Sequence, residues 1–220
     1  VRKFNQLAVP GLGGVWFAKQ RFLATLGVRI ADRLRFSSTN VKAIEIANAV
    51  EALASLCAFR RNGWTSDSRL RGRQKLAGTD DLTFSRLHQP RFYVTQPMRM
   101  ATVEALVDLG FVEPGSQRFN SFRCTQAGMD LIEAATAGHR PYNATVEDYL
   151  FGRAKDDAVI RDTDNLRNVL SPLIVLPPDA RILVRDKLCE GAGRNPEAAR
   201  RKNALGWVRS LDVNRPAGWK

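Results

Sequence analysis

The stretch from Val94 to Ile132 reads VTQPMRMATVEALVDLGFVEPGSQRFNSFRCTQAGMDLI, and its pattern predicts a helix, a β-hairpin and a second helix. Thr95 is a candidate N-cap of the first helix, because its hydroxyl can accept a hydrogen bond from an unpaired N–H of the first turn. Gly110 is a candidate terminator, since glycine readily adopts the left-handed conformation that ends many helices. The apolar positions between them recur at helical spacing and are expected to face a core: Met98, Ala101, Ala105, Leu106 and Leu109.

The residues after this helix predict a hairpin. One strand follows Gly110 directly, and residues 114–116, Pro-Gly-Ser, have the composition of a turn. Residues 118–125 alternate as a returning strand does, with Phe122 and Cys124 on one face and Arg123 on the other.

This order of elements resembles the second half of a winged helix-turn-helix domain. The residues that carry the resemblance are Leu-Gly-Phe-Val-Glu at 109–113 and Cys-Thr-Gln-Ala-Gly at 124–128. In that family the helix that ends in Leu-Gly is the recognition helix, the hairpin is the wing, and Thr125 would open and cap the following helix. The resemblance covers residues 79–137, although the connection at 89–93 is longer than a minimal helix-turn-helix turn. It implies a mainly α fold with a small β-hairpin, in which a winged-helix core is flanked by N-terminal and C-terminal helices.

The whole chain divides into three predicted segments. Residues 1–40 form an N-terminal arm and helix, residues 41–138 the winged-helix domain, and residues 139–220 a C-terminal helical region. The most apolar helix, at 41–61, is expected to be the first helix of the winged-helix domain or a strut beneath it. The helices expected outside the opening stretch are Val15–Arg35, Val41–Arg61, Asp81–His88, Thr145–Ala154, Asp162–Leu170, Pro178–Glu190 and Pro196–Leu211.

The charge of the chain is strongly positive and unevenly distributed. The 34 basic and 22 acidic residues give a net charge of +12. Residues 1–125 hold 19 basic and 9 acidic residues, net +10, whereas residues 126–220 hold 15 and 13, net +2. The excess therefore lies with the predicted winged helix, and it favours a polyanionic partner such as nucleic acid. A basic surface that serves only solubility is the alternative.

One run concentrates this charge. Arg69, Arg71, Arg73 and Lys75 occupy alternate positions, so an extended chain would place all four cations on one face. We expect no acid to neutralise them nearby and an anionic ligand to lie across them. The alternative is a mobile loop whose charges are solvated.

The resemblance also assigns residues that would contact DNA. The recognition helix would present Gln96, Arg99 and Thr102, with Met100, to the major groove, where Arg can contact guanine and Gln can pair with adenine. Arg118 and Arg123 on the wing would reach the minor groove or its phosphates. The complete set of expected DNA-binding residues is Arg69, Arg71, Arg73, Lys75, Arg91, Gln96, Arg99, Thr102, Arg118 and Arg123.

The sequence offers little for catalysis or metal binding. His88 and His139 are the only histidines, and neither has a Cys or His partner at ligand spacing. The aspartates within 156–164 are the alternative candidate for a metal site, since paired carboxylates hold magnesium in nucleases. Asp162 is equally suited to cap a helix, and no accompanying Lys completes a nuclease pattern. We therefore expect no catalytic residue, no metal and no cofactor.

The cysteines and the hydropathy indicate a compartment. Three cysteines that are far apart form no disulfide framework, which favours a reducing, cytoplasmic environment. No apolar stretch approaches the about 18 residues of a membrane helix, so no membrane partner is expected. Pro10 interrupts the apolar run after Arg2-Lys3, which argues against a secretory signal.

Together these patterns predict a non-catalytic protein that binds duplex DNA through a winged helix, either as a regulator or as the DNA-gripping subunit of a larger nucleoprotein machine. The alternative is an adaptor whose winged helix docks another protein subunit and has no direct role with nucleic acid. The sequence specifies neither a DNA sequence nor an oligomeric state.

Overall fold

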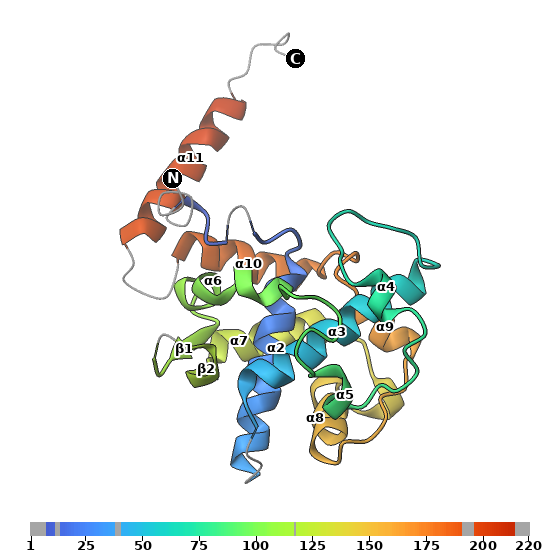
Figure 1. Ribbon diagram of the computed structural model, residues 1–220. Coiled ribbons are helices and arrows are strands. Elements are labelled where there is room, and N and C mark those ends of the chain that lie inside the picture. Colours follow the sequence, from blue (N-terminus) through green and yellow to red (C-terminus); the bar gives the residue numbers. More distant parts are fainter. Residues whose placement is uncertain (1–7, 12–13, 38–40, 117, 191–195, 214–220) are drawn as a thin grey trace.

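The computed structural model describes residues 8–11, 14–37, 41–116, 118–190 and 196–213. Within these ranges the chain is mainly helical, with ten α-helices and one two-stranded antiparallel sheet (Figure 1). The helices are α2 (Lys19–Phe36), α3 (Ala43–Arg61), α4 (Arg73–Leu76), α5 (Phe84–Leu87), α6 (Val103–Asp108), α7 (Gln126–Thr136), α8 (Val146–Lys155), α9 (Asp164–Leu170), α10 (Pro178–Glu190) and α11 (Pro196–Val213). The strands are β1 (Val112–Pro114) and β2 (Phe122–Cys124), and the 3-10 turns are η1 (Met98–Ala101), η2 (Phe119–Ser121) and η3 (Pro141–Asn143). The predicted mainly α fold with a small hairpin is confirmed, while residues 1–7 and 12–13 of the predicted arm lie outside the described residues.

Helices α2 and α3 form the centre of the molecule and pack closely on each other (Figure 1). A Cβ added to Gly27 of α2 would lie 2.6 Å from Cα of Ala47 of α3, so the glycine permits the close crossing. Helix α3 agrees with the prediction for residues 41–61. Helix α2 begins at Lys19 rather than Val15, because the Gln20 side chain accepts a hydrogen bond from the Phe17 N–H (2.8 Å) and holds a turn before the helix.

The remaining helices surround this pair. Helix α2 contacts α7, α8 and β2, helix α3 contacts α5 and α9, and α10 packs on α7. The hydroxyl of Thr125 accepts a hydrogen bond from the Gly128 N–H and caps α7, as predicted, and Thr145 and Thr163 cap α8 and α9 in the same way. Buried side chains from all three predicted segments join one hydrophobic cluster.

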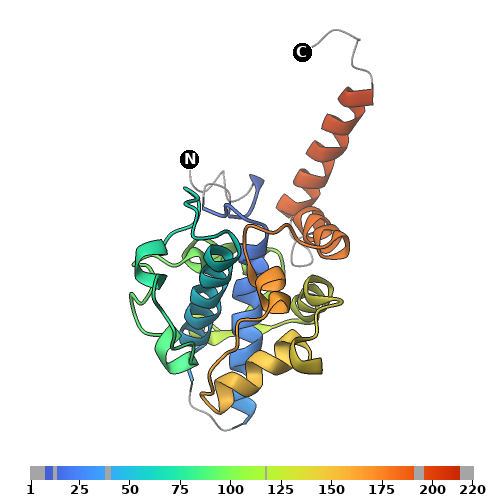
Figure 2. The ribbon, with the colours of Figure 1, turned by 90° about the vertical axis from the view of Figure 1, so that its right-hand side faces the viewer.

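Helix α11 projects away from this body. At its start Ala198 is buried, and the Arg201 guanidinium donates a hydrogen bond to the carbonyl of Leu188 on α10 (2.6 Å). From Lys202 onward the described side chains are exposed, and the helix extends beyond the other elements (Figure 2).

The helix predicted from Thr95 to Leu109 is broken. Residues 98–101 form η1, and the α-helix α6 begins only at Val103. Thr102 causes the break, because its N–H and its hydroxyl both donate to the carbonyl of Arg99, each at 2.8 Å. The predicted end of the helix is confirmed. Gly110 has φ 73°, and the Phe111 N–H donates a hydrogen bond to the carbonyl of Leu106.

Two further predictions fail within residues 69–88. The basic run is not extended throughout, since Gly72 adopts φ 94° and α4 begins at Arg73. The alternation that would align four cations is therefore lost. The helix predicted at 81–88 shrinks to α5, because the Asp81 carboxylate accepts hydrogen bonds from the N–H and the hydroxyl of Thr83 and holds a turn.

The hairpin forms largely as predicted. Val112 lies opposite Cys124, and Pro114 lies opposite Phe122. Phe122 is buried and Arg123 is exposed, which confirms the predicted alternation. The returning strand is shorter than predicted, because residues 119–121 form the turn η2.

Candidate nucleic-acid interface

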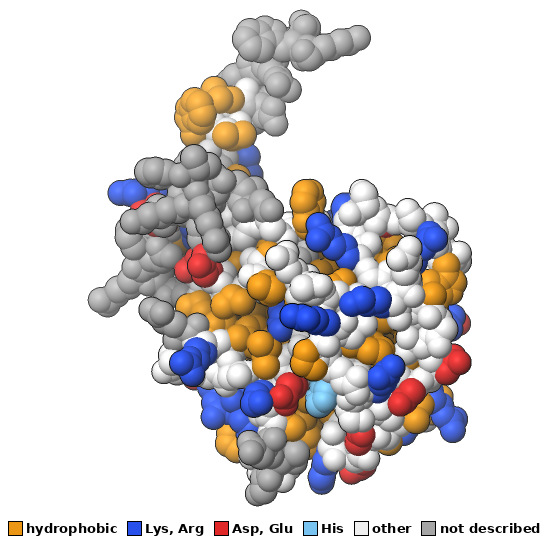
Figure 3. Space-filling view, viewed as in Figure 1, with side chains coloured by type: hydrophobic (Ala, Val, Ile, Leu, Met, Phe, Trp, Pro, Cys, Tyr) orange, Lys and Arg blue, Asp and Glu red, His pale blue; other side chains and the backbone are white. Residues whose placement is uncertain are grey.

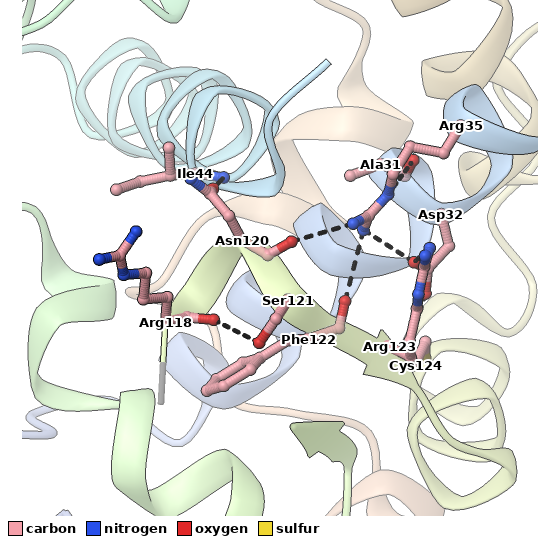
Figure 4. Close-up of polar contacts among 10 residues, drawn as sticks. All are labelled: Ala31, Asp32, Arg35, Ile44, Arg118, Asn120, Ser121, Phe122, Arg123 and Cys124. Atoms are coloured by element: carbon pink, nitrogen blue, oxygen red, sulfur yellow. Dashed lines mark hydrogen bonds and ion pairs between the residues drawn. The ribbon is translucent and has the colours of Figure 1, made fainter. Parts of the chain in front are cut away.

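The hairpin is fixed to the end of α2 through one buried carboxylate (Figure 4). Asp32 accepts hydrogen bonds from the Arg35 guanidinium (2.8 Å), the Arg123 guanidinium (2.9 Å) and the Cys124 N–H (2.8 Å). The Asp32 side chain is 6% exposed, so these bonds lie in a region where loss of the acceptor would be costly.

The tip of the hairpin is fixed as well. Arg35 donates to the carbonyls of Asn120 (3.0 Å) and Phe122 (3.3 Å), and the Asn120 side chain accepts a hydrogen bond from the Ile44 N–H (3.0 Å). That N–H belongs to the first turn of α3, where backbone donors lack partners inside the helix. The tip is thus docked between the end of α2 and the start of α3.

This docking separates the two cations predicted to act on the wing. Arg123 forms an ion pair with Asp32 at 2.9 Å, although 47% of its side chain is exposed. Arg118 is exposed, and no ion pair of its side chain occurs within the described residues. Of the two, Arg118 therefore has its charge available for a ligand.

Two segments that are distant in sequence bring most of the other predicted cations together. The Lys75 ammonium donates to the carbonyl of Arg91 (2.9 Å), and a Cβ on Gly72 would lie 2.9 Å from the carbonyl oxygen of Tyr93. The segments around α4 and before η1 therefore lie side by side. We call the exposed cations of these segments the basic face: Arg69, Arg71, Arg73, Lys75 and Arg91.

The basic face lies within a larger surface of mixed character. Figure 3 shows cationic side chains spread over the side that carries α4, α5 and α6, with apolar side chains between them and acidic ones mostly toward the lower edge. Residues 69–100 contain seven basic residues and only two acidic ones. The charge of this segment is therefore far from balanced.

The members of the basic face differ in their partners. Arg69 is paired with Asp67 through two contacts, at 2.8 and 3.0 Å, and these hydrogen bonds lower the pKa of Asp67 to about 2. The expectation that no acid lies near the run is therefore wrong for Arg69. Arg71, Arg73 and Arg91 form no ion pair within the described ranges.

Two residues expected to enter the major groove are buried. Arg99 is 6% exposed and lies over the Phe119 ring at 5.7 Å, and Thr102 is 0% exposed. A continuous helix was expected to expose Arg99 and Thr102, but the break at Thr102 places both side chains in the interior. Neither side chain can reach a base in this conformation. Gln96 and Met100 are exposed, as expected.

Arg99 belongs to a buried polar cluster that the sequence patterns did not predict. The Tyr93 hydroxyl donates to the Glu51 carboxylate on α3 (2.8 Å), and the Arg99 charge acts on the same group. Burial raises the pKa of Glu51 to about 7, and the hydrogen bond from Tyr93 and the Arg99 charge only partly offset this effect. The cluster attaches the segment before α6 to α3. Its one signal in the sequence is a glutamate in the middle of the most apolar helix.

A cavity of about 290 Å³ opens beside the basic face. Gln20 and Ser55 line it from the two central helices, while Trp16, Arg71 and Met100 line it nearer the surface. We call it the Trp16 cavity. The sequence patterns indicated no role for Trp16 beyond packing and none for Ser55, because no local pattern links residues so far apart.

The acidic residues near α9 have structural partners. Asp162 accepts hydrogen bonds from Arg60 and Arg167, both at 3.0 Å, and its side chain is 4% exposed. Asp157 accepts a hydrogen bond from the Ser85 N–H (2.8 Å). Asp162 therefore links α3 to α9, and Asp157 links the segment after α8 to α5. Among the described residues no group of three His, Cys, Asp or Glu side chains is placed to hold a metal ion.

No family model, curated protein or solved structure matches this chain. The winged-helix assignment therefore stays a prediction. Within the described ranges, no helix combines the length and the apolar character needed to cross a membrane.

Proposed function

We propose that this chain binds nucleic acid, with duplex DNA as its ligand, through the basic face and Arg118 on the hairpin. The observation that carries the proposal is that most cations of the basic face are exposed and form no ion pair in the part of the chain that the structure describes. Arg71, Arg73 and Arg91 are exposed on adjacent segments, and no carboxylate within the described residues pairs with them. Unpaired cations on adjacent segments make the local potential positive, and a row of phosphates would neutralise it.

Most of the proposed contacts are to the phosphate backbone of DNA and few are to its bases. Phosphate contacts position a protein on the duplex without specifying a sequence. With Arg99 buried, Gln96 is the remaining exposed candidate for base contact on the predicted recognition helix. This favours the DNA-gripping subunit of a nucleoprotein machine over a sequence-reading regulator, and the proposal assigns no reaction to the chain.

The winged-helix part of the proposal rests on the order of the elements. Helix α6 ends at Asp108, the hairpin begins soon after Gly110, and Thr125 caps α7. Phe119 at the hairpin tip lies beneath Arg99 of η1, so the hairpin is next to the turn that follows the Arg91 segment of the basic face. A DNA backbone that crosses the basic face would then approach Arg118.

A second candidate function, protein docking, has its own support in α11. This helix projects from the body with large apolar side chains exposed: Leu205 at 42%, Trp207 at 65%, Val208 at 51% and Leu211 at 50%. Exposed apolar side chains at helical spacing are typical of a surface that binds another protein. Docking through α11 is compatible with DNA binding on the basic face.

Charge-matched variants test the DNA proposal. The double variant Arg71→Ala/Arg91→Ala removes two cations from the basic face, and Arg181→Ala/Lys202→Ala removes two exposed cations from α10 and α11, on the opposite side of the molecule (Figure 2). Affinity for random-sequence duplex and for single-stranded DNA of equal length is measured at one low salt concentration.

We expect the first double variant to bind duplex at least about tenfold more weakly than wild type, or about 1.4 kcal/mol, and the control to bind like wild type. Equal affinities for all three proteins, or no binding by any, would overturn the proposal. If duplex binding is absent while α11 variants lose a protein partner, the docking function takes its place.

A further inference from the structure

We infer that the Trp16 cavity holds one unpaired base of a nucleic-acid strand whose phosphates lie along the basic face. This inference rests on the proposed function and adds to it a site that phosphate contacts with a duplex do not require. It follows from the size and walls of the cavity, from an unpartnered polar group in its floor, and from the charge at its rim.

The cavity is suited to a flat ring. Its volume of about 290 Å³ is near the lower end of small-molecule sites, about 300 Å³, so it fits a group of one or two rings. Trp16 is 67% exposed and Met100 is 58% exposed at the opening. Bases stack on exposed aromatic faces in proteins that bind single strands, and Trp16 offers such a face.

The floor of the cavity contains a polar group without a partner. Ser55 lies in the middle of α3 with 0% of its surface exposed, and its hydroxyl has no hydrogen-bond partner among the described residues. A buried hydroxyl without a partner is destabilising, and the polar edge of a base would satisfy it. The Gln20 amide nitrogen is also weakly held, since its contacts to the carbonyls of Met98 and Gly14 are 3.4 and 3.5 Å long.

The rim of the cavity is positive. Arg69 and Arg71 line it, and no carboxylate is among its described lining residues. Because Arg69 is paired with Asp67, Arg71 supplies the charge that is available to a ligand. A ligand with an uncharged ring inside and an anionic group outside matches this arrangement, as a base with its phosphate does. A free mononucleotide has the same chemistry. Arg73 and Arg91 are further exposed cations that do not line the cavity, and a strand with several phosphates would engage them where a single nucleotide need not.

The test uses 2-aminopurine, a fluorescent base whose emission falls when it stacks on an aromatic ring. One duplex carries it as a single unpaired base, a second carries it paired, and 2-aminopurine ribonucleotide is the free ligand. Each is titrated into wild type and Trp16→Ala. Trp207→Ala is the matched control, since Trp207 is 65% exposed on α11 and does not line the cavity. Trp16→Phe and Ser55→Ala complete the set, with thermal melting to verify that each variant is folded.

Wild type and Trp207→Ala should bind the duplex with the unpaired base about 5- to 150-fold more tightly than the paired duplex, with a loss of fluorescence. Trp16→Ala should lose this preference, Trp16→Phe should keep part of it, and Ser55→Ala should reduce it without loss of stability. Equal, salt-dependent binding of both duplexes by wild type would overturn the cavity inference and leave the proposed function standing. Absence of binding to either duplex would overturn both. If the free nucleotide binds as tightly as the duplex with the unpaired base, the ligand of the cavity is a mononucleotide and not a strand.

Discussion

The crossing of α2 and α3 makes a sharp prediction, because it brings together the helices that carry Gln20 and Ser55. Gly27 is packed so closely that an added Cβ would lie 2.6 Å from Cα and 2.8 Å from Cβ of Ala47. The neighbouring atoms are backbone and a side-chain stub, which have no rotamer with which to move away. Gly27→Ala should therefore force the two central helices apart.

The size of the effect follows from the distance. The closest carbon pair must open from 2.6 Å to a normal contact of roughly 3.5 Å, a separation of about 1 Å. Overpacking of this kind costs about 1–3 kcal/mol or more, while alanine in a helix regains about 0.5–1 kcal/mol over glycine. We expect the free energy of unfolding to fall by about 2 kcal/mol, and Tm by about 4–8 °C for a chain of this size.

Gly152 in α8 is the matched control. It is also a helical glycine, but a Cβ added to it would have no neighbouring atom within 4 Å, so Gly152→Ala should raise the unfolding free energy by about 0.5–1 kcal/mol. Urea denaturation followed by circular dichroism measures both variants. If Gly27→Ala is as stable as wild type, or gains stability as Gly152→Ala should, the close crossing is refuted.

Two other predictions concern buried carboxylates. Asp32→Ala should lower the unfolding free energy by about 2–3 kcal/mol, which is less than for a fully buried pair because Arg123 is half exposed. Glu113→Ala, at an exposed site, is the control in urea denaturation. Equal stability of the two variants would contradict the anchoring role of Asp32. For Glu51, burial raises the pKa from 4.5 to about 7, so the native state holds the proton more tightly than the unfolded state and stability falls as pH rises through this window. Glutamine does not titrate, so the difference in unfolding free energy between Glu51→Gln and wild type should increase by about 2 kcal/mol, in favour of the variant, from pH 5 to pH 8. If the unfolding free energies of the two proteins change in parallel with pH, Glu51 does not titrate in this way.

Local patterns in the sequence were sufficient for much of the fold. The apolar spacing of residues 41–61 predicted α3, and the alternation around Arg123 predicted which residues of the returning strand are buried. Thr125 was predicted as a cap because a capping hydroxyl bonds an N–H only three residues away. Such features depend on neighbours in the chain, so they can be read without knowledge of the tertiary structure.

The candidate site depends on partners that are distant in sequence. Arg99 has the spacing of an exposed helical residue, yet Glu51 on α3 and Phe119 on the hairpin surround it in the folded chain. Thr102 broke the helix through a hydrogen bond that apolar periodicity does not reveal. Trp16 and Ser55 meet at one cavity only because α2 and α3 cross.

The salt dependence of DNA binding tests the central claim most directly. Log K for a random duplex is measured against log salt for wild type, Arg71→Ala/Arg91→Ala and Arg181→Ala/Lys202→Ala. If the basic face contacts phosphates, log K should fall linearly, by about 0.9 per contact, and loss of two contacts should make the slope about 1.8 shallower in the first double variant only. A flat dependence in wild type, or the same slope in all three proteins, would contradict the claim.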